Sequence, residues 1–207
     1  MRTSKILLVG EKMSRTTVRS RERILEAGFR LFFREGYTRV SMEMIAVQAG
    51  MTKRTLYNHF DSKDQLLGAV LESQSRHSLA RFKNWTANSD HTIGGFLEQF
   101  FAKAFAWVGS ARWRGSGFTR LAMELADLPG HPARRIAARH KAELEKWMEA
   151  EFRERGSPNP ASDARTLALL MDGALSLSLI SGNRDYILHA RQAALDLLSF
   201  TLGANSG

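Results

Sequence analysis

The spacing of apolar residues constrains this chain more than any other feature. Nearly every stretch between its breaks repeats with the 3.6-residue period of a helix, and none alternates as a strand does. The four prolines fall in only two places, at positions 129 and 132 and at positions 158 and 160. We find no internal repeat and no long low-complexity tract. The sequence therefore predicts an all-α fold.

The breaks divide the chain into nine expected helices, and local signals mark several of their ends. Ser41, Thr52 and Ser62 each precede a helix and carry the short hydroxyl side chain that caps a helix N-terminus. Gly36 and Gly50 follow helices and suit the left-handed conformation that ends them. The expected helices are Arg19–Glu35, Met42–Ala49, Lys53–Phe60, Lys63–Asn84, Ile93–Val108, Phe118–Asp127, Ala133–Arg155, Ser162–Ser181 and Asp185–Leu202.

Helix length changes along the chain and predicts two domains. The helices within residues 19–66 are short or medium in length, whereas those within residues 67–207 are longer. Residues 1–18 are expected to form a disordered basic arm. Their apolar run, Ile6–Val9, is too short for the core of a signal peptide.

Composition excludes several classes of protein. Hydrophobic residues make up 43% of the 207 residues, which is enough for a packed core. The chain has no cysteine, which excludes disulfides, thiolate metal sites and cysteine nucleophiles and fits a reducing compartment such as the cytoplasm. The most apolar stretch, residues 166–183, contains Asp172 together with Gly and Ser, so we expect no membrane span.

Signatures of catalysis are also missing from the sequence. It contains no G-x-S-x-G, H-E-x-x-H or G-x-x-x-x-G-K-[ST] motif. Its six histidines lack the spacing of metal ligands. We therefore expect neither an enzyme nor a bound metal or cofactor.

Positive charge is concentrated near the N-terminus. The formal net charge is +9, and residues 1–65 hold 13 of the 30 Lys and Arg but only 7 of the 21 Asp and Glu. An anionic partner is therefore expected. Charge alone leaves nucleic acid, a membrane surface and an acidic protein open.

Residues 42–61 combine three features of two short helices that meet at a tight turn. Ala46 is small enough to let the second helix approach, Gly50 can adopt a positive φ, and Leu56 can fill the space between the helices. This spacing is typical of a helix-turn-helix.

The second helix of this pair carries hydrogen-bond donors and no acidic residue on its outward faces. Leu56 and Phe60 turn inward, which leaves outside Lys53, Arg54, Thr55, Tyr57 and Asn58. A helix fits the major groove of DNA, where Arg or Lys can bind guanine and Asn can bind adenine. The pattern therefore indicates a DNA-reading helix.

The same region resembles the N-terminal domain of the TetR family of bacterial transcription regulators. The matching motifs are Ile24-Leu25-x-x-Gly-x-x-Leu-Phe, Gly36-Tyr37, Ile45-Ala46, Ala49-Gly50-Met51-Thr52 and Thr55-Leu56-Tyr57-x-His59-Phe60-x-Ser62-Lys63. The later part of the chain resembles the family in length, helix number and its last two apolar helices. The resemblance implies a helix-turn-helix DNA-binding domain over residues 19–66, followed by a ligand-binding and dimerisation domain over residues 67–207.

The resemblance also implies roles on DNA for eight residues. Lys53, Arg54, Thr55 and Asn58 are expected to approach base edges, and Ser41, Tyr57, His59 and Lys63 to contact phosphates. Arg54 departs from the family, in which a small residue or proline is common there, so a different base preference is expected. Tyr57 and His59 could instead be core aromatics, and Ser41 is expected to cap its helix in either case.

The last two expected helices favour a homodimer that binds the two half-sites of a palindromic operator. They carry more apolar residues than one neighbour could cover, although a purely internal core is the other interpretation. The expected interface residues are Leu170, Met171, Leu175, Leu188, Leu195, Leu198 and Leu202. Asp172, in the same region, is expected to be a hydrogen-bonded structural carboxylate rather than a ligand contact.

In the TetR family the middle helices enclose a ligand cavity, which implies one here. The candidate lining residues are Phe100, Phe101, Phe105, Trp113, Phe118, Met123 and Trp147. Such a cavity would hold a small lipophilic effector, although aromatic residues at helical spacing more often belong to plain core. The family's usual mechanism implies a repressor that leaves its operator when the effector binds. Activation of transcription is the alternative form of regulation.

A non-enzymatic adapter, which binds a membrane surface or a protein through basic helices, is the alternative function. An adapter of this kind would show no preference for one DNA sequence. A DNA-reading regulator would prefer its own operator and would lose affinity steeply with salt.

Overall fold

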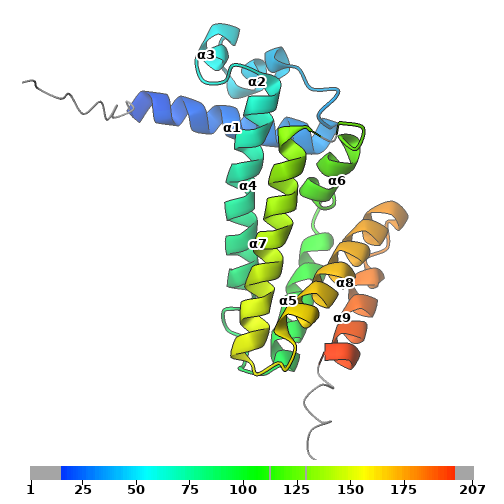
Figure 1. The fold of residues 1–207 in the computed structure, drawn as a ribbon. Coiled ribbons are helices and arrows are strands. Elements are labelled where there is room, and N and C mark those ends of the chain that lie inside the picture. The colour runs from blue at the N-terminus through cyan, green and yellow to red at the C-terminus, as the bar shows by residue number, and fades with distance from the viewer. Residues whose placement is uncertain (1–14, 112, 129, 199–207) are drawn as a thin grey trace, which may run out of the picture.

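The computed structural model describes residues 15–111, 113–128 and 130–198, and over these residues every regular element is an α-helix. The prediction of an all-α fold is therefore confirmed. In chain order the helices are α1 (Arg15–Glu35), α2 (Met42–Ala49), α3 (Lys53–Tyr57), α4 (Lys63–Thr86), α5 (Ile93–Val108), α6 (Gly117–Glu124), α7 (Pro132–Glu154), α8 (Pro160–Ser181) and α9 (Asp185–Leu198) (Figure 1).

The first helix is longer than the sequence predicts. α1 begins at Arg15, so residues 15–18 of the expected disordered arm are helical, and that boundary was wrong. The rest of the expected arm lies outside the described residues, as does Leu202.

Two other helices also differ from expectation, for local reasons. α3 ends at Tyr57 rather than at Phe60, because the amide of His59 bonds three residues back to the carbonyl of Leu56 and tightens the turn. α8 begins at Pro160, two residues early, since proline suits the first turn of a helix.

Side-chain caps begin the short helices as the sequence predicts. The hydroxyls of Ser41, Thr52 and Ser62 each accept a hydrogen bond from the amide three residues on, at 3.2, 3.1 and 3.1 Å. Gly50 ends α2 with a φ of 63°, which a residue with a side chain rarely adopts. These local bonds fix where α2 and α3 begin and how the chain turns between them.

Two hydrophobic cores organise the molecule. The first joins α1, α2 and α3 to the first turns of α4, and it is completed by α6 and the start of α7. Its members from those later helices include Phe118, Leu121, Leu125, Ala133 and Ala137. The expected domain boundary at residue 66 therefore does not limit this core, because helices from far along the chain cover it.

The second core fills the bundle of α5, α7, α8 and α9 together with the end of α4. Its centre is aromatic: the ring of Phe96 lies 5.7 Å from that of Phe152 and 6.1 Å from that of Trp147. α4 and α7 lie side by side and run in the same direction through both regions (Figure 1). These two helices connect the end that carries α2 and α3 to the bundle.

Candidate nucleic-acid interface and cavity

The turn between α2 and α3 has the geometry that the sequence predicts. Ala46 and Leu56 are buried on either side of Gly50. The guanidinium of Arg23, on α1, donates a hydrogen bond of 2.7 Å to the carbonyl of Ala49 and ties the end of α2 to the first helix. α3 is thereby held with its apolar side inward and its polar side outward.

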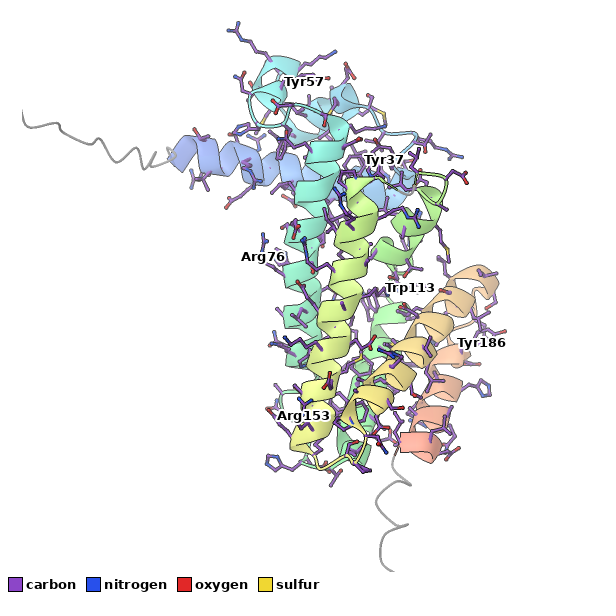
Figure 2. The ribbon with its side chains drawn as sticks, in the orientation of Figure 1. Tyr37, Tyr57, Arg76, Trp113, Arg153 and Tyr186 are labelled. Atoms are coloured by element: carbon purple, nitrogen blue, oxygen red, sulfur yellow. The ribbon has the colours of Figure 1, made fainter. Side chains whose placement is uncertain are left out.

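α3 lies at the outer end of the molecule, where Figure 2 labels Tyr57. Lys53, Arg54, Tyr57 and Asn58 are exposed to solvent. Thr55 is half-buried, and its hydroxyl lies 2.9 Å from the hydroxyl of the residue that caps the helix. Of the four side chains expected to read bases, three are therefore exposed and one is partly covered.

Lys53 has a partner within the protein. Its ammonium forms an ion pair with the carboxylate of Glu43 on α2 and lies 5.8 Å from the centre of the Tyr57 ring. The hydrogen bond that Lys53 donates to Glu43, more than the charge of that carboxylate, raises the pKa of Lys53. Because both groups are exposed, water and salt weaken this pair, and an incoming phosphate or base can replace the carboxylate.

Two of the residues expected on phosphates have structural roles. Ser41 is the cap of α2, as predicted. His59 is half-buried, and its Nε2 lies 2.7 Å from the hydroxyl of Ser20 on α1. Tyr57, in contrast, is an exposed residue and does not belong to the core.

Lys63 is tied to the loop between α1 and α2. Its ammonium donates hydrogen bonds of 3.0 Å to the carbonyls of Tyr37 and Val40, and it lies 4.1 Å from the centre of the Tyr37 ring. An ammonium has three N–H groups, so one is left for a phosphate. The sequence did not indicate these partners, because they are more than twenty residues away.

The C-terminal end of α6 holds the same loop. The carboxylate of Glu124 accepts hydrogen bonds from the amides of Tyr37 and Thr38, at 2.9 and 2.8 Å, and from the Thr38 hydroxyl at 2.9 Å. Burial disfavours the charge on Glu124, but these donors outweigh burial and lower its pKa. Gly36 lies so close that a Cβ there would meet the carboxylate at 3.0 Å. We call this contact the Glu124 clasp.

The N-terminal end of α6 lies beside a cavity. The side chain of Arg120 donates hydrogen bonds of 3.0 Å to the carbonyls of Phe33, at the end of α1, and Arg114, in the loop before α6. Gly117 and Phe118, at the start of the helix, line the cavity. α6 therefore contacts both the cavity and the domain that carries α3.

The cavity has a volume of about 840 Å³ and lies between α1, α4, α5, α6, α7 and α8. This volume is within the usual range for a site that holds a small organic molecule. Its aromatic lining comprises Phe29, Phe33, Phe82, Phe100, Trp107, Trp113 and Phe118. Figure 2 labels Trp113, in the loop between α5 and α6.

Three of the seven residues expected to line a cavity do so, namely Phe100, Trp113 and Phe118. The other four were placed wrongly. Phe101 and Trp147 are buried in the second core, Phe105 packs beneath the guanidinium of Arg184, and Met123 is 69% exposed on the outside of α6. Helical spacing identified these residues as apolar, but it could not tell which side of each helix faced the cavity.

A buried histidine forms part of the cavity wall. The ring of His140, on α7, stacks on Phe118 with 3.8 Å between centroids, and its Nδ1 lies 2.9 Å from the hydroxyl of Ser75. Burial, followed by the charges of Lys141 and Arg81, lowers the pKa of His140 to about 4. The ring is therefore neutral at physiological pH.

Asp172 also lines the cavity and has a partner within the chain. Both of its carboxylate oxygens accept hydrogen bonds from the ammonium of Lys141, and the longer of these is 2.6 Å. The expectation of a hydrogen-bonded carboxylate at this position agrees with the geometry.

The exposed apolar surface of α8 and α9 differs from the interface that the sequence predicts. Met171, Leu175 and Leu198 are buried within the chain's own core, so they were assigned to the wrong side of their helices. Leu170 and Leu195 are half-buried, and Leu188 is exposed. The exposed apolar residues of these helices that the predicted interface did not include are Leu169, Leu177, Leu179, Ile180, Tyr186 and Leu197.

Part of this surface forms one stripe along α8, at Leu169, Gly173, Leu177 and Ile180. Ile180 is 81% exposed, and nothing lies within 4 Å of the position that a Cβ on Gly173 would occupy. Because α8 is apolar around most of its circumference, its sequence alone could not reveal which residues form this stripe. We call these four residues the α8 stripe.

Among the described residues, α8 is the helix whose length and apolar composition would permit a membrane span. About 33% of that stretch is buried inside the chain, and core helices of soluble proteins have the same composition. No group of three or more metal-binding side chains occurs within the described part of the chain.

Comparison with known proteins places these features in context. Residues 24–70 match the family model described as "Bacterial regulatory proteins, tetR family". The chain is 30% identical over 185 residues to the HTH-type transcriptional regulator LmrA of Bacillus subtilis, and the match spans 86% of this chain and 96% of LmrA.

Solved structures agree along most of the chain. A TetR-type regulator from Streptomyces avermitilis is 30% identical, with a TM-score of 0.74 over 86% of this chain and 97% of its own. SCO4454, a TetR-family transcriptional regulator from Streptomyces coelicolor, is 25% identical, with a TM-score of 0.77 over 88% and 97%. Both the helix-turn-helix region and the helical bundle therefore have counterparts in the same solved proteins.

Proposed function

Because the chain belongs to the TetR family of bacterial transcription regulators, we propose that it represses transcription from a palindromic operator. It binds this operator as a homodimer through α2 and α3, and it leaves when a small lipophilic effector enters the cavity. Regulators of this family are not enzymes. The protein acts in the cytoplasm, without a cofactor.

The observation that carries this proposal is the exposed polar face of α3. Lys53, Arg54 and Asn58 stand at the outer end of the molecule on a helix whose apolar residue, Leu56, is fully buried. Arg and Lys side chains can bind guanine O6 and N7, and Asn can bind adenine N6 and N7. Tyr57, beside them, can donate to a phosphate.

A homodimer is supported by the α8 stripe. One short α3 makes few base contacts, whereas two copies on half-sites about 34 to 36 Å apart bind together. Apolar residues exposed in a row on a long helix are typical of an interface between chains. Two copies of α8 and α9 would then form a four-helix contact.

Release by the effector is supported by the position of α6. One end of this helix lines the cavity, and the other end forms the Glu124 clasp on the loop that precedes α2. A ligand that favours another position of α6 would also favour another spacing of the two α3 helices in the dimer. The population that fits the operator would then fall.

Selection of bound fragments from random duplex DNA tests this function. We expect the full chain to enrich an inverted repeat whose half-sites lie one helical turn apart. A membrane or protein adapter would enrich no sequence. A thermal-shift screen with lipophilic compounds would then identify molecules that stabilise the protein and release the selected operator.

Sedimentation of an interface variant tests the homodimer. Ile180→Lys places a charge in the α8 stripe, and we expect it to produce monomers and weaken operator binding. Met123→Lys is the matched control, because Met123 is similarly exposed but lies on α6. Dimers that persist in Ile180→Lys would contradict the proposed interface.

A further inference from the structure

We propose that the effector is an aromatic carboxylate whose anionic group pairs with Arg81 while its flat apolar body lies against the aromatic wall of the cavity. This inference rests on the proposed function only in assuming that the cavity described above is the effector site. The argument begins with the surroundings of Arg81.

Arg81 lines the cavity from α4, on the same side of the helix as Ser78 and Phe82. Its guanidinium lies 4.9 Å from the centre of the Trp107 ring and 5.7 Å from that of Phe82. It donates a hydrogen bond to the hydroxyl of Ser78 at 3.5 Å, which is a weak contact. The guanidinium thus lies over two adjacent aromatic rings, and the described residues occupy few of its five donors.

Every other cationic side chain of the cavity wall has a partner in the described part of the chain. Four of them form ion pairs with carboxylates, namely Arg30 with Glu26, Arg34 with Glu35, Lys141 with Asp172 and Arg165 with Glu145. The fifth, Arg114, donates hydrogen bonds to the carbonyls of Ala111 and Trp113. Arg81 has neither a carboxylate nor a carbonyl partner among the described residues.

The surroundings of Arg81 make an anion favourable there. Arg81 is exposed to solvent at the cavity wall, but the side chains packed around it partly desolvate its guanidinium and lower its pKa, and arginine remains charged at neutral pH. A cation that has lost water without gaining an anion is costly to hold, and an incoming carboxylate would offset that cost. Glu145 and Asp172 are the two acidic residues of the wall, and each is already paired with a cation. The net charge of the wall is therefore positive.

The rest of the wall indicates what the carboxylate is attached to. Phe82, Phe100, Trp107 and Phe118 present rings to the cavity, and aromatic rings pack well against flat aromatic partners. His140 is neutral at physiological pH, so it supplies a hydrogen-bonding ring without adding charge. A guanidinium offers two parallel donors that match the two oxygens of one carboxylate.

Calorimetry with matched pairs of acids and amides tests this inference. The probes are 2-naphthoate, biphenyl-4-carboxylate and anthracene-2-carboxylate, each compared with its primary amide on the full chain without DNA. We expect at least one acid to bind, and to bind more tightly than its amide. Arg81→Gln should weaken acid binding by about tenfold or more while changing amide binding by less than about twofold.

Two further variants distinguish the charge of Arg81 from the geometry of its paired donors, and both from the loss of any cation on α4. Arg81→Lys keeps the charge but loses the paired donors, so it should still prefer acids, at lower affinity than the wild type. Arg76→Gln is the control on the same helix. Arg76 is exposed, does not line the cavity and projects away from α7 in Figure 2, so this change should leave both ligands unaffected.

Three results would overturn the inference: no acid binds, acids and amides bind equally, or Arg81→Gln retains the acid preference. These outcomes are distinct from failure of the proposed function. If acids bind through Arg81 but the operator is not released, effector control is wrong and the binding site stands. If the operator is selected but acids do not bind, DNA recognition stands and the ligand class is wrong.

Discussion

The two ends of this molecule use positive charge in different surroundings. Lys53 and Arg54 stand in water on α3, whereas Arg81, although also exposed, lies over two adjacent aromatic rings in the cavity wall. Solvated cations attract phosphates over a distance and are screened by salt, while a partly desolvated cation binds one anion at short range. The same residue type is therefore suited to a long polyanion at one end and to a single small anion at the other.

The largest expected difference between the two sites is the dependence of their binding affinity on salt concentration. Between about 50 and 200 mM salt we expect operator affinity to fall about a thousandfold or more, because a dimer that neutralises several phosphates releases their counterions. Binding of 2-naphthoate should change by less than about threefold, since a single ion pair with a small anion releases far fewer counterions than a DNA duplex does. Fluorescence anisotropy of a labelled operator and calorimetry of the acid provide the two slopes. If operator affinity and acid affinity depended equally on salt concentration, the proposed difference between the two sites would be contradicted.

The cavity should also make stability depend on pH. The pKa of His140 is about 4 in the folded chain and 6.5 ordinarily, so the unfolded chain binds a proton first as the pH falls. Stability is complete above pH 6.5 and is lost between pH 6.5 and about 4, by on the order of 3 kcal/mol.

Chemical denaturation at several pH values measures this loss. His140→Asn can keep the hydrogen bond to Ser75 but cannot take up the proton, so its unfolding free energy should vary less over the same range. His77→Asn is the control, because His77 is exposed on α4. If wild type and His140→Asn respond identically, the histidine is not held neutral by burial.

The Glu124 clasp connects the two ends of the molecule, and it should contribute less to the unfolding free energy than His140 does. Glu124→Gln keeps the size of the side chain but removes the charge from three hydrogen bonds, so we expect the unfolding free energy to fall by about 1 kcal/mol. The loss of operator affinity caused by an effector should shrink as well. Denaturation and operator titrations with and without effector measure both quantities. Glu154→Gln, at the exposed end of α7, should change neither.

Local signals made the DNA-binding end predictable from the sequence. The caps at Ser41, Thr52 and Ser62 and the left-handed turn at Gly50 depend on residues within one helical turn, so their positions were predicted correctly. The partners of Lys63 were not predicted, because they come from a loop more than twenty residues away. A residue type indicates what a side chain can bind, but only the fold determines what lies beside it.

The bundle was less predictable because its helices are apolar on several sides. Met171 faces the core and Leu177 faces solvent, although both are large apolar residues on the same helix. Arg81 was not among the residues predicted to line the cavity. A signal was present on α4, where Gln74, Ser78 and Arg81 follow one another at helical spacing beside Phe82, which places polar groups on a side that also carries an aromatic residue.

The most direct test of the account is a competition titration that ranks duplex sequences. Anisotropy would compare the selected operator with versions changed at each position, using the wild type, Arg54→Ala and the distant control Arg76→Ala. We expect Arg54→Ala to alter the order of preference at one position of each half-site, by about 1 to 3 kcal/mol per contact. Arg76→Ala should preserve the order. An unchanged order in Arg54→Ala, or equal binding of all duplexes by the wild type, would contradict recognition of DNA bases by α3.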